Sequence, residues 1–304
     1  MRVDFVTCDV FTDRPFAGNP LLVVPDARGL SAAQMQSIAR EINYSESTFV
    51  LPADEASHAY RQRTFVPVKE IPYAGHPTVG TALVLSWLGA IAPPEGGSGT
   101  RPVTIEVGFG PLGLDVSFEK SHATRVRMAQ GKPEWGAPVT EAGLLSRLSE
   151  GLRVPVGALG GGLPLRSVST GNRFLIVPVA DVAALSGADA DPRLLVALEE
   201  ELGVLGTYLF AFAPGGQVRA RAFCPGAGVP EDPATGSAAG PLGVYLALER
   251  ALPGGSARFS IDQGIEMGRP SVLGVEVATA ADGTPAGVRV EGSAVRMMSG
   301  WLEV

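Results

Sequence analysis

Cysteine is scarce in this 304-residue chain, which contains only Cys8 and Cys224. Two cysteines cannot staple a protein of this size, so the sequence argues against a disulfide-stabilised extracellular fold and predicts a reducing, cytoplasmic compartment. Both thiols lie in strand-like segments, where cysteine behaves as a small buried hydrophobe. Three dispersed histidines and two distant cysteines give no metal-ligand spacing, so we expect no metal site.

Charge and long apolar runs are also limited. Charged residues make up 18% of the chain, and 24 basic against 31 acidic side chains give a net charge of −7 with no basic stripe. We therefore expect neither nucleic acid nor a membrane surface as a partner. No run of 18 apolar residues occurs, and the N-terminus lacks the basic and apolar regions of a signal peptide, so a membrane span is not expected.

Motifs for nucleotide binding and for serine hydrolysis are missing as well. The chain has no G-x-x-x-x-G-K-[ST] loop and no G-x-S-x-G elbow. Residues 108–113 match G-x-G-x-x-G, but Pro111 and the strand-like residues that follow predict a hairpin rather than a dinucleotide loop.

The chain is instead rich in the residues that form short strands and turns. Gly (39) and Pro (25) make up about a fifth of it, and hydrophobic residues make up 45%. Short branched or aromatic stretches bounded by turn residues predict a β-rich protein. Five helices are expected, after Ser31, from Pro77, after Thr140, from Asp191-Pro192 and after Thr235, where Pro241 would kink or delay the last one.

An internal repeat indicates two similar halves. Residues 63–72 read R-x-F-x-P-x-x-x-x-P, and residues 221–230 read the same 158 positions later. In both copies a strand leads into a Pro-bounded loop, a small-residue turn and an apolar helix. The helix from Pro77 to Leu88 is apolar on nearly every side, as a helix enclosed by a sheet must be. We therefore predict two pseudo-symmetric halves of an α+β fold, each a strongly curved sheet wrapped on one apolar helix.

If the halves face each other, the N-termini of their helices meet at a cleft. Unpaired N–H groups and the positive end of the helix dipole can bind a carboxylate there or stabilise an enolate. Glu46 lies among hydroxyl residues just past a helix and could be a general base, although taken alone the segment favours a solvated loop glutamate. His76, next to Gly75 at a helix start, could donate a hydrogen bond or simply cap the helix.

The third polar segment surrounds Asp232. Because Asp232 precedes a proline, its backbone is extended and its side chain can point across a cleft. Gly236 and Ser237 then offer backbone N–H groups at a helix N-terminus. The alternative is that Asp232 and Thr235 merely cap this helix.

These segments resemble the PhzF-like proteins, the phenazine-biosynthesis isomerase family. The matching motifs, in the same order along the chain, are Asp9–Asp13 with Gly18-Asn19-Pro20, Ser45–Phe49, Gly75–Thr78, Glu231–Ala238, and Gln263-Gly264 with Met267–Ser271. The resemblance implies the diaminopimelate-epimerase-like fold, in which each of two similar domains is a β-barrel-like sheet around a central α-helix. The expected domains are residues 1–130 with a final strand at 294–304, and residues 131–293.

The resemblance also implies a role for each site residue. Glu46 would be the general acid and base that moves a proton between carbons of a small, cyclic amino-carboxylate, as in trans-2,3-dihydro-3-hydroxyanthranilate isomerisation. His76, Asp232, Gly75, Gly236 and Ser237 would bind this substrate in a homodimer without a cofactor. Two readings stay open beside it: a non-catalytic small-molecule-binding or protective protein with the same cleft, and an isomerase or epimerase acting on an unrelated amino acid.

Overall fold

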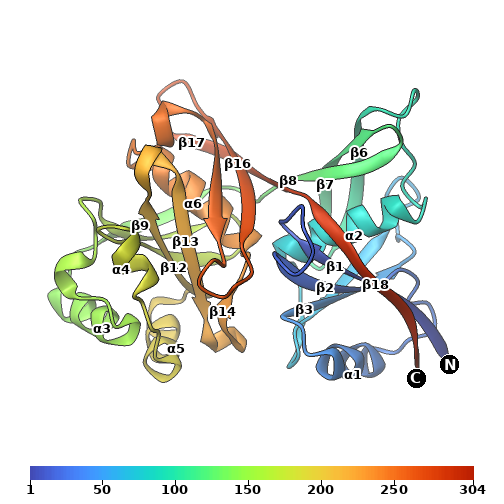
Figure 1. Cartoon of the computed structure of the whole chain (residues 1–304), viewed down its shortest axis with the longest axis horizontal. Helices are drawn as coiled ribbons and strands as arrows, with labels where there is room; N and C mark the ends of the chain where they lie inside the picture. Colours follow the sequence, from blue (N-terminus) through green and yellow to red (C-terminus); the bar gives the residue numbers. More distant parts are fainter. The chain divides into compact units, whose positions relative to one another are not determined.

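The computed structural model describes all 304 residues, which separate into two compact units. The N-terminal unit comprises residues 1–129 and 291–304, and the C-terminal unit comprises residues 130–290. The sequence predicted these boundaries at 130/131 and 293/294. Figure 1 shows the C-terminal strand, drawn in red, lying along the blue N-terminal strand of the first unit. No helix combines the length and the apolarity needed to cross a membrane.

The N-terminal unit is built from nine strands and two helices. Its elements are β1 (Arg2–Val10), β2 (Asn19–Val24), α1 (Ala32–Ile42), β3 (Glu46–Leu51), β4 (Arg61–Phe65), β5 (Glu70–Ile71), α2 (Gly75–Trp87), β6 (Gly99–Val107), β7 (Gly110–Glu119), β8 (His122–Ala129) and β18 (Ala294–Glu303). The strands follow the order β18-β1-β2-β3-β4-β6-β7-β8, and β5 forms a short hairpin with β4. Only the pairs β2–β3 and β4–β6 are parallel.

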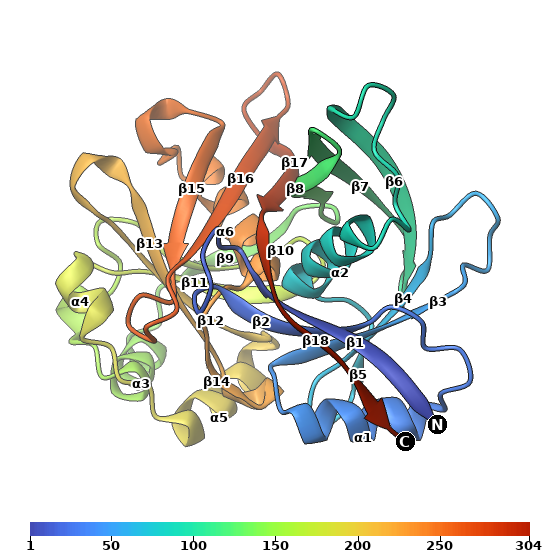
Figure 2. The same ribbon diagram turned by 45° about the vertical axis from the view of Figure 1, so that its right-hand side comes forward.

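Helix α2 is the centre of this unit. It contacts β8 at one end of the strand order and β18, β1, β2 and β3 at the other, so the sheet curls around it (Figure 2). All residues from Gly75 to Leu85 are buried, which explains why the helix has no polar face. At Gly80 an added Cβ would lie 2.6 Å from Leu21 and 2.7 Å from Val10, so the first two strands pack directly on the helix backbone.

The C-terminal unit repeats this plan. Its elements are β9 (Glu134–Val139), α3 (Ala142–Leu152), β10 (Leu165–Ser169), β11 (Arg173–Pro178), α4 (Val182–Ser186), α5 (Pro192–Leu202), β12 (Gly206–Phe212), β13 (Val218–Cys224), β14 (Val229–Asp232), α6 (Gly236–Leu248), β15 (Arg258–Gln263), β16 (Ser271–Thr279) and β17 (Pro285–Gly292), whose last two residues belong to the first unit. Short 3₁₀ turns cover Val156–Ala158, Pro214–Gly216, Pro225–Ala227 and Pro253–Gly255.

The strand order of this unit is β9-β10-β11-β12-β13-β15-β16-β17, with β14 in a hairpin on β13. Again only two pairs are parallel, β11–β12 and β13–β15, and they occupy the same places in the order as β2–β3 and β4–β6. Helix α6 takes the place of α2 and contacts β10, β11 and β16. This correspondence confirms the predicted α+β fold of two pseudo-symmetric sheets, each wrapped on a central helix.

The sequence repeat corresponds to the same side-chain cluster in each unit. Arg63 on β4 lies over the ring of Phe65 and binds Glu70 through two hydrogen bonds of 2.6 and 2.7 Å. In the C-terminal unit Arg221 on β13 lies over the ring of Phe223 and is held by Glu231 in the same bidentate way, at 2.8 and 2.9 Å. The matched positions therefore hold each strand to the hairpin that follows it.

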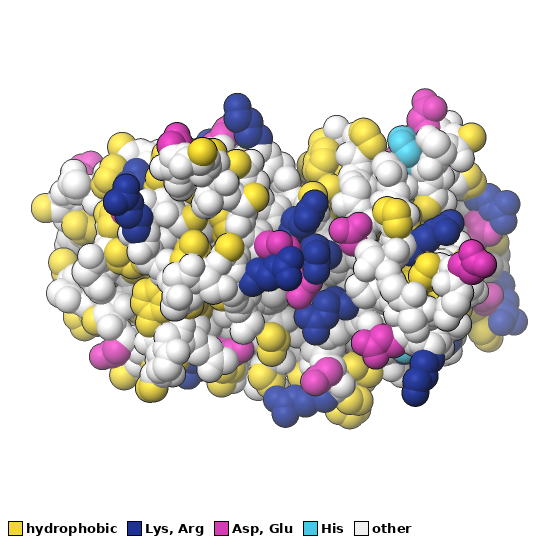
Figure 3. Space-filling model, turned by 90° about the horizontal axis from the view of Figure 1, so that it is seen from above, with side chains coloured by type: hydrophobic (Ala, Val, Ile, Leu, Met, Phe, Trp, Pro, Cys, Tyr) yellow, Lys and Arg dark blue, Asp and Glu magenta, His cyan; other side chains and the backbone are white.

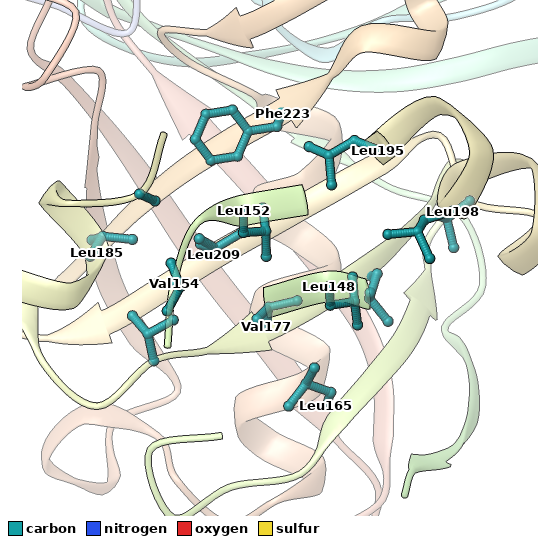
Figure 4. Packing of buried hydrophobic residues seen from close by; sticks show 14 of the residues in the cluster. Leu148, Leu152, Val154, Leu165, Val177, Leu185, Leu195, Leu198, Leu209 and Phe223 are labelled. Carbon is teal, nitrogen blue, oxygen red and sulfur yellow. The ribbon is translucent and has the colours of Figure 1, made fainter. Parts of the chain in front are cut away.

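The outer face of the C-terminal sheet carries its own hydrophobic core. Side chains alternate along a strand, so Phe210 of β12 packs against Tyr245 of α6 while its neighbour Leu209 points to the opposite face. There, Figure 4 shows Leu148 of α3 and Leu195 of α5 directed toward the strands. Burial of each such leucine stabilises the fold by about 2 kcal/mol.

Local signals were confirmed at some helix ends and wrong at others. Helix α1 has the expected capping box, with Ser31 and Gln34 bonding to each other's backbone N–H groups. Helix α2 begins at Gly75, two residues before the predicted start at Pro77. Pro241 lies inside α6 and does not delay it, since the helix already begins at Gly236.

On the face shown in Figure 3, basic side chains lie among acidic ones, without a surface of one sign.

Candidate active site

The side chains of Glu46 and His76 meet inside the N-terminal unit. The Nδ1 atom of His76 lies 2.9 Å from Oε2 of Glu46, and the two side chains are 3% and 17% exposed. Glu46 is the first residue of β3, and alternation places it on the same face as Thr48, whose hydroxyl is 2.8 Å from that of Thr81 on α2. The strand therefore directs Glu46 to the N-terminus of α2, where His76 lies. The expectation of a solvated loop glutamate is wrong.

His76 does not cap the helix on which it lies. The N-cap of α2 is Ala74, which has no side-chain capping bond, and His76 is the second helical residue. Its Nδ1 is used by Glu46, while its Nε2 is buried and has no hydrogen-bond partner. A buried imidazole nitrogen without a partner costs free energy, so it is a group that a ligand can satisfy. The positive end of the α2 dipole adds to this preference for an oxygen-rich ligand.

The residue before Glu46 ties its strand to β2. The Ser45 hydroxyl donates to Oδ1 of Asn19 at 3.0 Å, and Asn19 is fully buried at the start of β2. Leu21 of β2 is the parallel partner of Glu46. These contacts fix the backbone on which the carboxylate sits, so Glu46 enters the site from a rigid strand end rather than from a free loop.

The C-terminal unit carries a second polar cluster at the start of α6. Asp232 is 8% exposed, and its Oδ2 accepts a 2.6 Å hydrogen bond from the Thr235 hydroxyl. Thr235 is the N-cap of α6 but makes no side-chain capping bond, because its hydroxyl is committed to Asp232. The alternative of a threonine that merely caps the helix is therefore wrong.

The remaining predicted residues lie at the first positions of the two central helices. Gly75 begins α2 and Gly236 begins α6, and both are buried. Ser237 follows Gly236 and is half-buried. Since both helices start without a side-chain cap, their first N–H groups are not used by a capping side chain and can bind the oxygens of a substrate.

The C-terminal unit has no counterpart of Glu46. The residue that begins β12, as Glu46 begins β3, is Gly206. A Cβ at Gly206 would lie 2.4 Å from the sulfur of Cys224 and 2.6 Å from the carbonyl oxygen of Phe223. This strand position thus has room for an acidic side chain in the N-terminal unit only. Both cysteines are buried, and burial raises the pKa of the Cys8 thiol.

Comparison with known proteins identifies the family. The family model described as phenazine biosynthesis-like protein matches residues 8–300. The chain belongs to this family. It is 36% identical over 296 residues to the trans-2,3-dihydro-3-hydroxyanthranilate isomerase of Pseudomonas aeruginosa, covering 97% of this chain and 98% of that protein. A PhzF-family phenazine biosynthesis protein from Bacillus anthracis has a similar structure, with a TM-score of 0.86, 25% identity and full coverage of both chains.

The chain is an isomerase of the phenazine biosynthesis-like family, and these relatives favour catalysis over the alternative of non-catalytic binding. Its fold is shared more widely. A probable proline racemase from Agrobacterium radiobacter superposes with a TM-score of 0.67 at 14% identity, covering 99% of this chain and 92% of that one. No group of three or more His, Cys, Asp or Glu side chains is arranged to hold a metal ion.

Several residues of the polar cluster around Asp232 could not be recognised from the sequence. Thr235 and Gln263 lie in motifs that resemble the family, but the sequence predicts no contact between them, and it gives no role to Tyr208. The available signal was a polar group inside an otherwise apolar pattern. A polar group in such a pattern either is buried with a hydrogen-bond partner or lies at the surface.

Proposed function

We propose that this isomerase moves a proton between two carbons of a small cyclic amino-carboxylate, with Glu46 as the single general acid and base and no cofactor. The observation that carries the proposal is the partly buried Glu46–His76 pair at the N-terminus of α2. The relative's substrate, trans-2,3-dihydro-3-hydroxyanthranilate, is the first compound to test. Glu46 takes a proton from one carbon, the electron pair of that C–H bond shifts into the conjugated system, and Glu46 returns the proton to another carbon.

Of the two matched strand starts only one carries an acid, Glu46, and this supports a proton shift on one face of the substrate. Removal and return on the same face need a single group that can pivot, whereas racemisation needs groups on two faces. The close packing at Gly206 leaves no space for a second acid at the matching position. The resemblance to the diaminopimelate-epimerase-like fold implies related epimerases with a cysteine in each half, and here those places hold His76 and the Ala234–Ser237 stretch.

The other site residues bind the substrate in this proposal. His76 orients Glu46 through Nδ1 and offers Nε2 to a polar substituent of the ring. From the C-terminal unit, Asp232 binds the amino or hydroxyl group, and the backbone N–H groups of Gly236 and Ser237 bind carboxylate oxygens. Gly75 provides the same kind of donor at the start of α2. Donors fixed in advance stabilise the charge that develops as the proton leaves.

The test replaces Glu46 by glutamine, which keeps the shape of the side chain and removes the proton acceptor. Wild-type protein in D₂O should introduce deuterium into trans-2,3-dihydro-3-hydroxyanthranilate, observed by NMR. Glu46→Gln should lower the rate by about 10²–10⁴-fold, since that is the usual contribution of general acid-base catalysis.

Glu41→Gln is the matched control, because Glu41 is an exposed glutamate on α1 outside the site. It should keep the wild-type rate, and both variants should keep the wild-type melting temperature. A Glu46→Gln variant with wild-type exchange would refute the role of Glu46. Binding without any exchange by the wild type would refute the isomerisation of this substrate.

A further inference from the structure

Gln263, the last residue of β15, is a fully buried amide next to the Asp232 cluster. It is held between two strands, because it pairs with Ala220 of β13 and Ser271 of β16. A buried primary amide is costly unless its oxygen and both N–H groups have partners. The partners of Gln263 therefore show what this residue does.

The amide of Gln263 makes four hydrogen bonds, which use its full capacity. Its Oε1 accepts from the Tyr208 hydroxyl at 2.8 Å and from the Thr235 backbone N–H at 3.2 Å. Its Nε2 donates to the Asp232 carbonyl at 2.7 Å and to the Thr235 hydroxyl at 2.9 Å. Three of the four bonds go to the Asp232–Thr235 turn.

This arrangement fixes the direction of every hydrogen bond up to the Asp232 carboxylate. The backbone N–H of Thr235 must face an acceptor and the carbonyl of Asp232 must face a donor, so the amide of Gln263 has only one orientation. Because Nε2 donates to the Thr235 hydroxyl, the hydroxyl proton is directed to Oδ2 of Asp232. The chain Tyr208–Gln263–Thr235–Asp232 thus holds one carboxylate oxygen as an acceptor.

The next residue brings the same strand end against the same turn by packing. Gly264 has φ +76°, and a Cβ there would lie 2.5 Å from the carbonyl oxygen of Pro233 and 2.4 Å from that of Arg269. Only glycine allows this close approach. Gln263 and Gly264 therefore fix the position of the Asp232–Thr235 turn from one side, by hydrogen bonds and by contact.

We propose that Gln263 is a positioning residue that sets the orientation of Asp232 for substrate binding, acting through Thr235 and the Asp232 backbone. The inference rests on the proposed function in taking Asp232 as a substrate-binding residue. Gln263 itself need not touch the substrate. Misplacing a binding group by about 1 Å can lower activity by about 10²-fold, so the loss of these bonds has a measurable effect.

The experiment compares Gln263→Met with Gln62→Met. Methionine keeps the size and unbranched shape of glutamine and removes its hydrogen bonds. Gln62 on β4 is the matched control, because it is also buried, at 3% exposure, but bonds only to Thr64 in the N-terminal unit. Gln263→Met should lower kcat/KM for trans-2,3-dihydro-3-hydroxyanthranilate by about 10²-fold with a raised KM, and Gln62→Met should leave both constants within twofold.

Two further variants separate positioning from a loss of folded protein. If Gln263 acts only through Asp232, the double variant Asp232→Asn with Gln263→Met should be no slower than Asp232→Asn alone. If Gln263→Met does not fold, as judged by circular dichroism, Tyr208→Phe removes one bond to Oε1 and should raise KM about threefold. A decrease in kcat with unchanged KM, in proportion to the folded fraction, would overturn the inference.

Binding of 3-hydroxyanthranilate, the aromatic analogue of that substrate, distinguishes the two proposals because it needs no turnover. Calorimetry should show binding at least tenfold weaker for Gln263→Met than for wild type. If the wild type isomerises the substrate and Gln263→Met binds the analogue as tightly as the wild type does, the inference is wrong and the proposed function stands. If the wild type binds the analogue but does not isomerise the substrate, and Gln263→Met binds the analogue more weakly, the proposed function is wrong and the inference stands. If the wild type neither binds the analogue nor isomerises the substrate, both are wrong.

Discussion

The two units share a strand order but differ at the starts of their central helices. At the start of α2 an ionisable pair, Glu46 and His76, lies beneath the helix N-terminus. At the start of α6 the corresponding region is an amide and hydroxyl network that ends on Asp232. Gly206 stands where the other unit has Glu46, and its surroundings are filled by the chain itself. One fold thus holds an ionisable Glu46–His76 pair in one copy and a hydrogen-bonded carboxylate in the other.

This difference shows that the repeated fold and the polar residues at the helix starts are subject to different constraints. The curved sheet and central helix are needed in both copies because each unit must bury its own core. The residues at the helix starts carry no such constraint, since neither helix relies on a capping side chain there. The two copies can therefore carry different residues at these positions, and the proposed function needs a proton-transferring residue in only one of them. Substitutions at matched positions of the two units test this comparison.

The largest expected difference concerns the two repeated arginines. Arg221 has a 7% exposed side chain, and besides Glu231 its guanidinium donates to three carbonyls at the end of α4, residues 185–188. Arg63 is 27% exposed and has only Glu70 and a ring as partners. Arg221→Ala should cost about 3–5 kcal/mol because it leaves a partly buried carboxylate and three carbonyls unpaired. Arg63→Ala should cost about 1 kcal/mol or less.

Thermal unfolding of both variants measures this difference. Lysine at each position is the control, because it keeps the charge and loses the planar fork, so only Arg221→Lys should be strongly destabilised. Equal losses at the two positions would mean that the clusters are energetically equivalent despite their different burial.

A smaller effect is expected from Gly206→Ala. The new methyl group would meet the Cys224 sulfur and the Phe223 carbonyl at less than 3 Å, so we expect a loss of about 2–3 kcal/mol from overpacking. Glu46→Ala causes no overpacking at the matching place, and we expect it to cost only about 1 kcal/mol, because Nδ1 of His76 loses its partner. Calorimetric scans of the two variants provide the comparison, and Cys224→Ala added to Gly206→Ala should restore part of the stability. A fully stable Gly206→Ala variant would show that a second side chain fits there.

The smallest effects are the opposite responses of two buried carboxylates to pH. Glu199 of α5 is 4% exposed, and burial raises its pKa to about 7, with only the Gly226 N–H bonded to it. In the N-terminal unit the N–H groups of Asp54 and Glu55, and then His58, lower the pKa of Glu106 to about 2. The Glu199 contribution is complete below its unfolded pKa and is lost as pH rises through 7. The Glu106 contribution is present above its unfolded pKa and is lost as pH falls toward 2.

Melting temperatures from pH 3 to pH 8 test this pair. Glu199→Gln should reduce the decrease in stability between about pH 4.5 and pH 7. Glu106→Gln should be less stable than wild type near neutral pH and should approach it in acid. If both substitutions changed the pH dependence of stability in the same direction, the opposite pKa shifts of the two carboxylates would be contradicted.

Much of the fold could be predicted from local patterns, and the misses have identifiable causes. Ser31 with Gln34 marked the start of α1 because a capping box is formed within four residues. Pro77 gave the start of α2 two residues late, because proline is tolerated anywhere in the first turn. Glu46 resembled a loop residue beside Ser45 and Ser47, yet Ser47 and Thr48 are fully buried in β3. The composition of one segment cannot show that the polar side chains of a strand lie on the buried inner face of a curved sheet.

The chain's order of residues by itself determined the duplicated architecture, because alternation, capping and the repeated Arg-x-Phe-x-Pro pattern are short-range properties. Only the tertiary structure decided which polar groups meet. His76 reaches Glu46 across 30 positions, and Gln263 reaches Thr235 across 28, in each case because a curved sheet returns a strand end to the start of its central helix. Such contacts depend on how the whole sheet closes, which no segment of sequence contains.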